Sequence, residues 1–266
     1  MQQLSKLRFA PDLLKGRVAL VTGGGTGIGA AIAQALVQAG LRVTVVGRRL
    51  EPLQALAQSY PGAMQAIVAD VADPQTVAHA FNQARANFGP IQVLVNNAGQ
   101  ARSAPFLKTD ADLWQRMLDV NLGGTLHCSQ AALPDMLSAG WGRIVNVAST
   151  AGLVGYAYVA AYCAAKHAVV GLTRAMALEF AKKGITVNAV CPGYTETEIL
   201  QKSISLVMEK TGRTQEQART EFAASNPQGR IVQPHEVADT VRWLCGDAAA
   251  SVTGQAIAVC GGEVMH

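Results

Sequence analysis

A glycine-rich turn separates the first apolar strand of the chain from its first helical segment. Residues 17–21 form a short apolar run, Thr22-Gly23-Gly24-Gly25-Thr26-Gly27-Ile28-Gly29 follows, and an alanine-rich stretch then continues to Ala39. Glycine lets the backbone turn tightly and lets a phosphate approach the amides. The helix that begins here directs its free N–H groups toward that phosphate. The pattern G-x-x-x-G-x-G between a strand and a helix therefore predicts a nucleotide-binding βαβ unit, although a glycine cluster alone can also be a plain loop.

Apolar strands alternate with helical segments along the rest of the chain. We expect strands at residues 43–46, 65–69, 92–95, 143–147, 185–190 and 256–259. Strands that are apolar throughout indicate a parallel sheet that is covered on both faces. The sequence therefore predicts an α/β fold, a Rossmann-type doubly wound parallel sheet of about seven strands in one domain over residues 1–266. Residues 1–15 form an N-terminal extension without the apolar core of a signal peptide or membrane anchor.

Several helices have recognisable boundaries in the sequence. Asp73-Pro74 is typical of an N-cap followed by proline in the first turn. We expect a helical stretch in two pieces over residues 110–139 and a long helix over residues 156–183. The segment 195–230 has no strand, and Thr214 with Gln217 fits a capping box, which predicts a short helix there. We interpret this segment as a substrate lid, with an ordinary surface excursion as the alternative.

Composition excludes several classes of protein. Of the 266 residues, 50% are hydrophobic and 15% are charged, which is typical of a folded domain with a large core. The formal net charge of +4 is scattered, so we expect no nucleic-acid partner, and no run is long enough for a membrane span. The five cysteines have no metal-ligand spacing, which favours reduced thiols in a cytoplasmic protein and no metal site. We interpret Cys163 as a helix-packing residue.

Tyr162 and Lys166 form the spacing Y-x-x-x-K in an alanine-rich, helical context. Residues i and i+4 share one face of a helix, so the phenol and the ammonium would point into the same space. A nearby cation favours the phenolate, and we therefore expect Lys166 to lower the pKa of Tyr162 toward the range of proton transfer. Tyr156 and Tyr158 lack a lysine four residues later. The alternative for any such pair is a coincidence on the surface.

The ordered set of motifs resembles the classical short-chain dehydrogenases/reductases. Thr22 to Gly29 resembles the cofactor turn of that family, and Asn96-Asn97-Ala98-Gly99 resembles its N-N-A-G motif. Asn121 resembles the family's helix asparagine, and Ser149 lies thirteen residues before Tyr162. Pro192-Gly193 and Thr197 complete the match, which runs from about residue 17 to residue 262.

The resemblance implies a role for each of these residues. Tyr162 would be the general acid in carbonyl reduction and the base in alcohol oxidation, and Lys166 would lower its pKa and hold the nicotinamide ribose. Ser149 would position the substrate oxygen, and Asn121 would hold a water near Lys166. Homotetramers or homodimers, built through the long helices, are common in the family. The expected cofactor contacts are Gly23, Gly25, Thr26, Gly27, Ile28, Gly29, Arg48, Arg49, Asp70, Asn96, Ala98, Gly99, Tyr162, Lys166, Pro192, Gly193, Thr195 and Thr197.

The end of the second strand bears on the choice of nicotinamide cofactor. In this fold an acid about 20 residues past the glycine turn binds the adenine ribose of NAD. Gly47 stands at the expected place of that acid, and Arg48 and Arg49 follow. Arginine pairs well with a phosphate, so NADP(H) is favoured over NAD(H). The alternative is that both arginines merely begin the next helix. Asp70 matches the family's adenine-binding acid.

Within the family, the stretch from residue 185 to Gly193 and the ending Val259-Cys260-Gly261-Gly262 look most similar to aromatic polyketide ketoreductases and 3-oxoacyl thioester reductases. The loop from Gln100 to Ala104 departs from the glycine-rich loop of the polyketide enzymes. The first hypothesis is an NADPH-dependent reductase of a β-keto compound, with a CoA- or carrier-bound acyl group as one form of the small-molecule substrate. A catabolic dehydrogenase of a hydroxyacyl-CoA or cyclic alcohol is the second, and an inactive nucleotide-binding scaffold is the third. Apolar residues of the segment 195–230 would either line an acyl site or pack the lid itself: Leu200, Ile204, Leu206, Val207, Met208 and Phe222.

Overall fold

The structure is a computed structural model that describes residues 14–265, and its described part contains one seven-stranded parallel sheet. The strand order is β3-β2-β1-β4-β5-β6-β7, so the chain winds outward from β1 in both directions. This order confirms the predicted doubly wound sheet and creates a crevice beside β1 and β4, where such folds bind ligands. The strands are β1 (Val18–Thr22), β2 (Arg42–Gly47), β3 (Met64–Val68), β4 (Val93–Asn96), β5 (Gly142–Val147), β6 (Ile185–Pro192) and β7 (Ala256–Val259).

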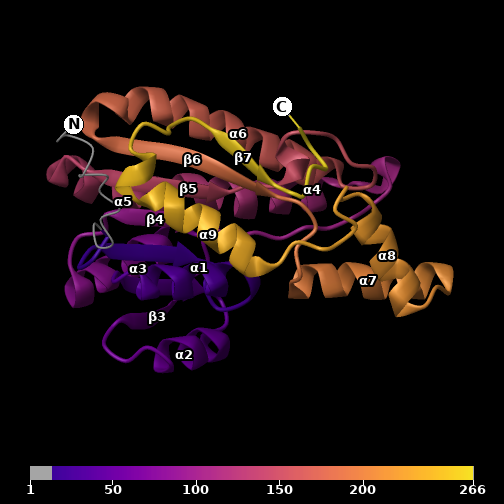
Figure 1. The fold of residues 1–266 in the computed structure, drawn as a ribbon, viewed down its shortest axis with the longest axis horizontal. Coiled ribbons are helices and arrows are strands. Elements are labelled where there is room, and N and C mark those ends of the chain that lie inside the picture. Colours follow the sequence, from indigo (N-terminus) through magenta and orange to yellow (C-terminus); the bar gives the residue numbers. More distant parts are fainter. Residues whose placement is uncertain (1–13, 266) are drawn as a thin grey trace, which may run out of the picture.

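Helices cover both faces of this sheet, as Figure 1 shows. One apolar cluster joins one sheet face to α1 and α9, through residues such as Ile32 and Val241. A second cluster joins the other face to α3, α5 and α6, with Phe81 fully buried at its centre. The helices are α1 (Gly27–Gln38), α2 (Leu50–Gln58), α3 (Pro74–Phe88), α4 (Ala111–Leu118), α5 (Gly124–Ala139), α6 (Ala160–Phe180), α7 (Glu198–Thr211), α8 (Gln215–Ala224) and α9 (Pro234–Cys245).

The observed elements confirm all seven predicted strands to within two residues and correct two helices. The predicted helix over residues 156–183 begins only at Ala160, because Tyr158 adopts a left-handed φ of 66° that no helix accepts. Helix α9 has no counterpart among the predicted elements, although its proline at N1 and its Gln233/Glu236 capping box are sequence signals. The stretch 110–139 is in two helices as expected, joined by a π-helical turn at Asp119–Gly123. The predicted N-terminal extension lies outside the described residues as far as residue 13.

Helices α7 and α8 project from one end of the molecule (Figure 1). The predicted capping box is present: Thr214 accepts from the amide of Gln217, and the Gln217 side chain accepts from the amide of Thr214. The two helices share a small apolar cluster of their own, with Leu200, Ile204, Val207, Met208 and Phe222 among its members. These side chains therefore pack against one another, Leu206 is the predicted apolar residue outside the cluster, and the role of the segment as a substrate lid stays a prediction.

Candidate active site

The glycine turn joins the carboxyl ends of β1 and β4. The Thr22 hydroxyl oxygen accepts from the amides of Asn97 and Ala98, both at 3.0 Å. The Asn97 side chain donates to the carbonyls of Thr22 and Gly23 at 3.0 and 3.1 Å. Gly23 has a φ of 63°, and a Cβ there would lie 2.8 Å from Asn97 Nδ2. Glycine at position 23 is thus required both by backbone conformation and by the close approach of the neighbouring strand.

Helix α1 begins inside this turn, at Gly27. A Cβ on Gly29 would collide with the carbonyl oxygen of Gly23, so the helix and the strand meet too closely for any side chain. Gly27 has a φ of 53° and lies against Thr197, whose Cγ2 is 3.1 Å from the position of a Cβ. The start of α7 therefore covers the turn at the amino end of α1, where a pyrophosphate would bind.

The other predicted residues of the turn take different positions. Thr26 is the N-cap of α1 and makes no side-chain capping hydrogen bond. Gly25 faces α2, because a Cβ there would lie 3.3 Å from Leu53. Ile28 packs partly against the core on the α1 face. Gly25 and Ile28 therefore support the turn from outside, whereas Gly23, Gly27 and Gly29 shape its backbone.

Tyr162 and Lys166 share one face at the start of α6, as predicted from their spacing. The Lys166 ammonium lies 5.7 Å from the centroid of the Tyr162 ring and donates to the Val147 carbonyl at 2.8 Å. Lys166 is buried, with 5% of its surface exposed. Ser149, just after β5, caps a short 3₁₀ turn by accepting from the Ala151 amide at 3.1 Å. The ends of β5 and α6 thus bring Ser149, Tyr162 and Lys166 together.

Burial shifts the pKa of both Tyr162 and Lys166. Burial raises this pKa to about 12, and a hydrogen bond with the Ser149 side chain only partly opposes the rise. Burial also lowers the pKa of Lys166 to about 8. Desolvation is thus the largest influence on the Tyr162 pKa, and the expected lowering of this pKa by Lys166 stays a prediction. At neutral pH the phenol keeps its proton and is a hydrogen-bond donor.

Asn121 lies in the π-helical turn between α4 and α5 and is buried. Its side-chain amide donates to the carbonyls of Gln100 and Met117, and its oxygen accepts from the Gln100 amide at 3.3 Å. Asn121 and Lys166 both approach Gly99: a Cβ at Gly99 would be 2.8 Å from Asn121 Oδ1 and 3.6 Å from Lys166 Nζ. Asn121 thus positions the loop after β4 beside Lys166, and its predicted role of holding a water stays a prediction.

The residues expected to select the cofactor meet at the ends of β2 and β3. The Arg48 guanidinium is 4.0 Å from Asp70, and both side chains are largely exposed. Arg49 forms an ion pair of 3.1 Å with Glu198 in the first turn of α7. Gly47 ends β2 and pairs with Val68 in the sheet register, so the position expected for an NAD-binding acid carries no side chain. Two arginines therefore stand at the predicted position of a ribose phosphate.

The remaining predicted cofactor residues divide into two groups. Pro192 ends β6, Gly193 and Thr195 follow it at the same edge of the sheet, and the Thr195 hydroxyl donates to the Gly193 carbonyl at 2.9 Å. Asn96 is different, because its side chain is buried among Ser129 and Asn146 and donates to both. The Asn96 side chain therefore has a structural role inside the sheet, and a cofactor contact of Asn96 through its backbone stays a prediction.

Three residues that sequence reasoning did not single out as functional lie beside this group. The Tyr156 hydroxyl is 2.7 Å from Glu263 Oε1 and 2.9 Å from Thr150 Oγ1. Thr150 directly follows Ser149. Of these, only Glu263 had a signal in the sequence, because this single carboxylate directly follows Gly261-Gly262, where the resemblance to the family ends. Tyr158 is the non-glycine residue with a positive φ among those described, and its carbonyl accepts from Ala104 in the loop after β4. Strained backbone of this kind concentrates at functional sites.

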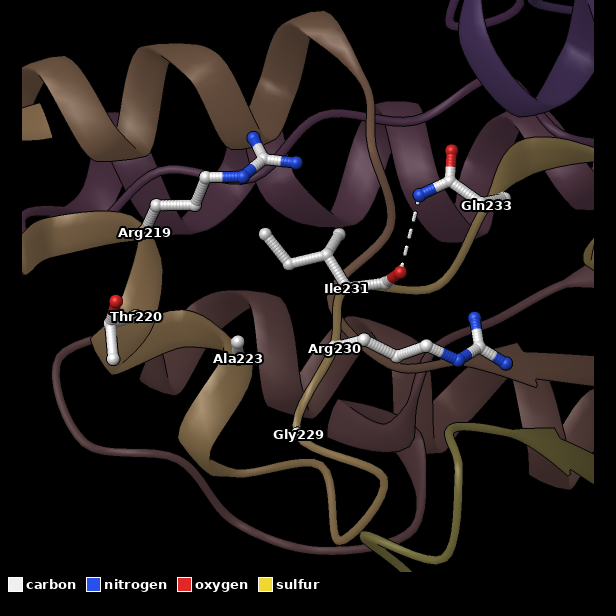
Figure 2. Close-up of a pocket in the computed structure, with 7 residues that line it drawn as sticks. All are labelled: Arg219, Thr220, Ala223, Gly229, Arg230, Ile231 and Gln233. Carbon is white, nitrogen blue, oxygen red and sulfur yellow. Dashed lines mark hydrogen bonds between the residues drawn. The ribbon is translucent and has the colours of Figure 1, made fainter. Parts of the chain in front are cut away.

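A pocket of about 390 Å³ lies away from this group, between α8 and the segment that leads to α9. Figure 2 shows its lining, in which Gln233 donates to the Ile231 carbonyl at 3.3 Å. Its two arginines are each held by a carboxylate, Arg219 by Glu196 and Arg230 by Glu236. No predicted catalytic or cofactor residue lines this pocket. Among the described residues, no group of three or more His, Cys, Asp or Glu side chains could hold a metal ion.

Comparisons with known proteins agree with this geometry. The family model for "short chain dehydrogenase" matches residues 17–206. A crystal structure of a phenylalanine-to-tryptophan variant of actinorhodin polyketide ketoreductase with NADPH has a TM-score of 0.89 and 40% sequence identity, over 93% of this chain and 97% of that one. A D-beta-hydroxybutyrate dehydrogenase of Cupriavidus necator is 37% identical over 96% of this chain and 100% of its own length. A cyclohexanol dehydrogenase of an Acinetobacter species is 38% identical over 92% and 94%.

The chain belongs to the short-chain dehydrogenase family. It is an oxidoreductase that acts on CH–OH and C=O groups, like the proteins named above. The match confirms the resemblance inferred from the ordered motifs, including its similarity to polyketide ketoreductases. Within residues 14–265, none of the helices has the length and apolar character needed to cross a membrane.

Proposed function

We propose that this protein reduces the keto group of a 3-oxoacyl thioester or a similar β-keto compound with NADPH. The observation that carries the proposal is the placement of Tyr162 beside Ser149 and Lys166, and the likeness to the NADPH-bound ketoreductase supports the direction. A protonated phenol beside Ser149 can give a proton to a carbonyl oxygen. The bound nicotinamide would supply the hydride. Ser149 would hold the carbonyl oxygen, and Lys166 would hold the nicotinamide ribose from the α6 side.

The choice of NADP(H) rests on the end of β2. Arg48 is 67% exposed there and Arg49 64%, so both are accessible to a phosphate. A guanidinium suits a phosphate because it offers several donors in one plane. The ketoreductase of similar structure was crystallised with NADPH, which supports the same assignment for this chain.

The proposal has three further parts. Helices α7 and α8 act as the substrate lid, since Thr197 at the start of α7 already covers the glycine turn. The protein works in the cytoplasm with its cysteines reduced, and burial raises the pKa of the Cys128 and Cys245 thiols to about 12. It assembles as a homotetramer or homodimer through α4, α5 and α6, which expose Trp114, Leu126 and Leu178.

A dehydrogenase of a hydroxyacyl-CoA or cyclic alcohol is the second candidate, favoured by relatives that are named as dehydrogenases. Initial rates decide between the two. We would measure β-ketoacyl thioesters and cyclic ketones with NADPH and NADH, and the matching alcohols with both oxidised cofactors. We expect the highest kcat/KM with NADPH and a β-keto thioester, and a loss of at least about tenfold in NADPH affinity, but not in NADH affinity, for Arg48→Gln. Faster turnover of an alcohol with NAD would overturn the proposal.

A further inference from the structure

The C-terminal segment folds back over the carboxyl end of the sheet. Gly261 and Gly262 have φ values of 62° and 94°, which reverse the chain after β7. A Cβ on Gly261 would collide with the buried side chain of Asn226, which itself donates to the Arg230 carbonyl at 2.7 Å. The Val264 amide donates to Cys260 Sγ at 3.4 Å and closes the turn. The backbone on both sides of Glu263 is therefore fixed against the protein.

This turn places the Glu263 carboxylate between Tyr156, which precedes α6, and Gly193, which follows β6. Its Oε1 accepts from the Tyr156 hydroxyl at 2.7 Å, and its Oε2 is 2.8 Å from where a Cβ on Gly193 would lie. Because a phenol has one proton, Tyr156 donates to Glu263 while the Thr150 hydroxyl donates to Tyr156 at 2.9 Å. A chain of hydrogen bonds thus runs from Glu263 to the residue that follows Ser149.

The wall around this carboxylate is aromatic and carries no positive charge. Tyr194 packs edge-on against Tyr156, with ring centroids 6.4 Å apart, and against Phe222 of α8, with centroids 4.8 Å apart. In the part of the chain that the structure describes, no lysine, arginine or histidine forms an ion pair with Glu263. The segment from Ser149 to Tyr162 contains no basic residue. A negative group on a substrate that approached Glu263 would therefore meet a carboxylate whose charge no paired cation offsets.

We propose that Glu263 is a specificity-determining residue that excludes substrates with a negative charge close to the reacting carbonyl. The inference rests on the proposed function and narrows it to neutral β-keto esters, thioesters and ketones, as opposed to free β-keto acids. Relatives named for a carboxylate substrate and for a neutral cyclic alcohol are almost equally similar to this chain, at 37% and 38% identity. Overall similarity therefore does not separate the two classes of substrate, whereas a single fixed carboxylate does.

Acetoacetate and methyl acetoacetate provide the test, because they share one reacting carbonyl and differ by one charge. We would measure kcat/KM for both with NADPH, and compare their ratio in the wild type and in Glu263→Gln. We expect the wild type to favour the ester, and the ratio of acid to ester to rise about tenfold in the variant, as expected for one like-charge contact near a protein surface. The amide keeps the size of the side chain and its acceptor for Tyr156.

Glu179→Gln is the matched control. Glu179 is exposed on the same helix as Tyr162, seventeen residues further along, which corresponds to about 25 Å of helix. Removing its charge should leave the ratio unchanged. If Glu263→Gln does not fold, the wild-type ratio at rising salt replaces it, because screening should also raise the ratio.

The outcomes separate this inference from the proposed function. A wild type that prefers acetoacetate, or a ratio that changes neither in Glu263→Gln nor with salt, overturns the role of Glu263 while leaving the reductase intact. A wild type that reduces neither compound and none of the thioesters overturns the proposed function, and the inference fails with it.

Discussion

The carboxyl edge of the sheet and the helical pair α7–α8 are held in different ways. At the sheet edge, polar side chains bond to backbone atoms of other strands: Thr22 accepts from the β4 end, Asn97 donates to the β1 end, and Lys166 donates to the carbonyl of Val147. Each partner belongs to a buried strand or its first flanking residue. Moving any one of these groups would therefore require a strand of the sheet to move.

The helical pair is attached mainly through its own apolar cluster and through exposed ion pairs. Leu200, Ile204 and Ala218 are buried against each other and Ile231 rather than against the sheet. Arg49 with Glu198, at 64% and 50% exposure, connects the pair to the end of β2. Exposed ion pairs contribute little free energy because water and salt screen them. The contrast indicates that the sheet fixes the positions of Thr22, Asn97 and Lys166, whereas α7 and α8, which we propose as the substrate lid, can shift without unfolding the sheet.

The largest expected effect comes from the sheet edge. Tyr162→Phe should lower kcat about a thousandfold, because it removes the proposed proton donor. Folding should persist, since the ring and its packing remain. Single-turnover reduction of a β-keto thioester, with NADPH absorbance as the signal, measures the chemical step. Tyr158→Phe is the matched control, as Tyr158 lies in the loop just before α6 and is 68% exposed. A loss below tenfold in Tyr162→Phe would show that another group supplies the proton.

Gly29→Ala tests whether the junction of β1 and α1 is as tight as the structure indicates. A methyl group there would collide with the Gly23 carbonyl, so we expect a destabilisation of about 1–3 kcal/mol together with weaker NADPH binding. Gly171→Ala is the counterpart, because a Cβ in the middle of α6 meets open space. That substitution should stabilise the protein by up to about 1 kcal/mol. Urea unfolding of both variants measures the difference, and equal effects would contradict it.

The sheet edge was also the region that could be predicted best from sequence. Apolar strands, the glycine turn and the spacing of Tyr162 with Lys166 are local patterns, and the structure brings those residues together. The surroundings of a side chain could not be predicted in the same way, because they depend on residues far away in the chain. Burial raises the pKa of Tyr162, and the Asn96 side chain points into the sheet and not into the cofactor crevice. A functional role for Glu263 was not predicted, because its hydrogen-bond partner Tyr156 is 107 residues away in the chain. No local pattern indicates which distant hydroxyl a single carboxylate will meet.

The smallest expected effect is the loss of an exposed ion pair in α7–α8. The loss of a less exposed ion pair between α3 and α5 provides the comparison. Arg213 and Glu221 form an ion pair between α8 and the loop before it, with 48% and 56% exposure. Arg213→Met should therefore change the free energy of unfolding by less than about 1 kcal/mol.

Arg85 binds Asp135 at 2.8 Å with 28% and 15% exposure, and Asp135 also accepts from the Ile91 amide. Arg85→Met leaves that carboxylate without its cation and should cost about 2 kcal/mol or more. Urea denaturation at low and high salt measures both, and the Arg213 effect should vanish at high salt because its charges are exposed. If the two substitutions cost the same, exposure does not decide what an ion pair contributes here, and the weak contribution assigned to the exposed ion pairs of α7 and α8 is wrong.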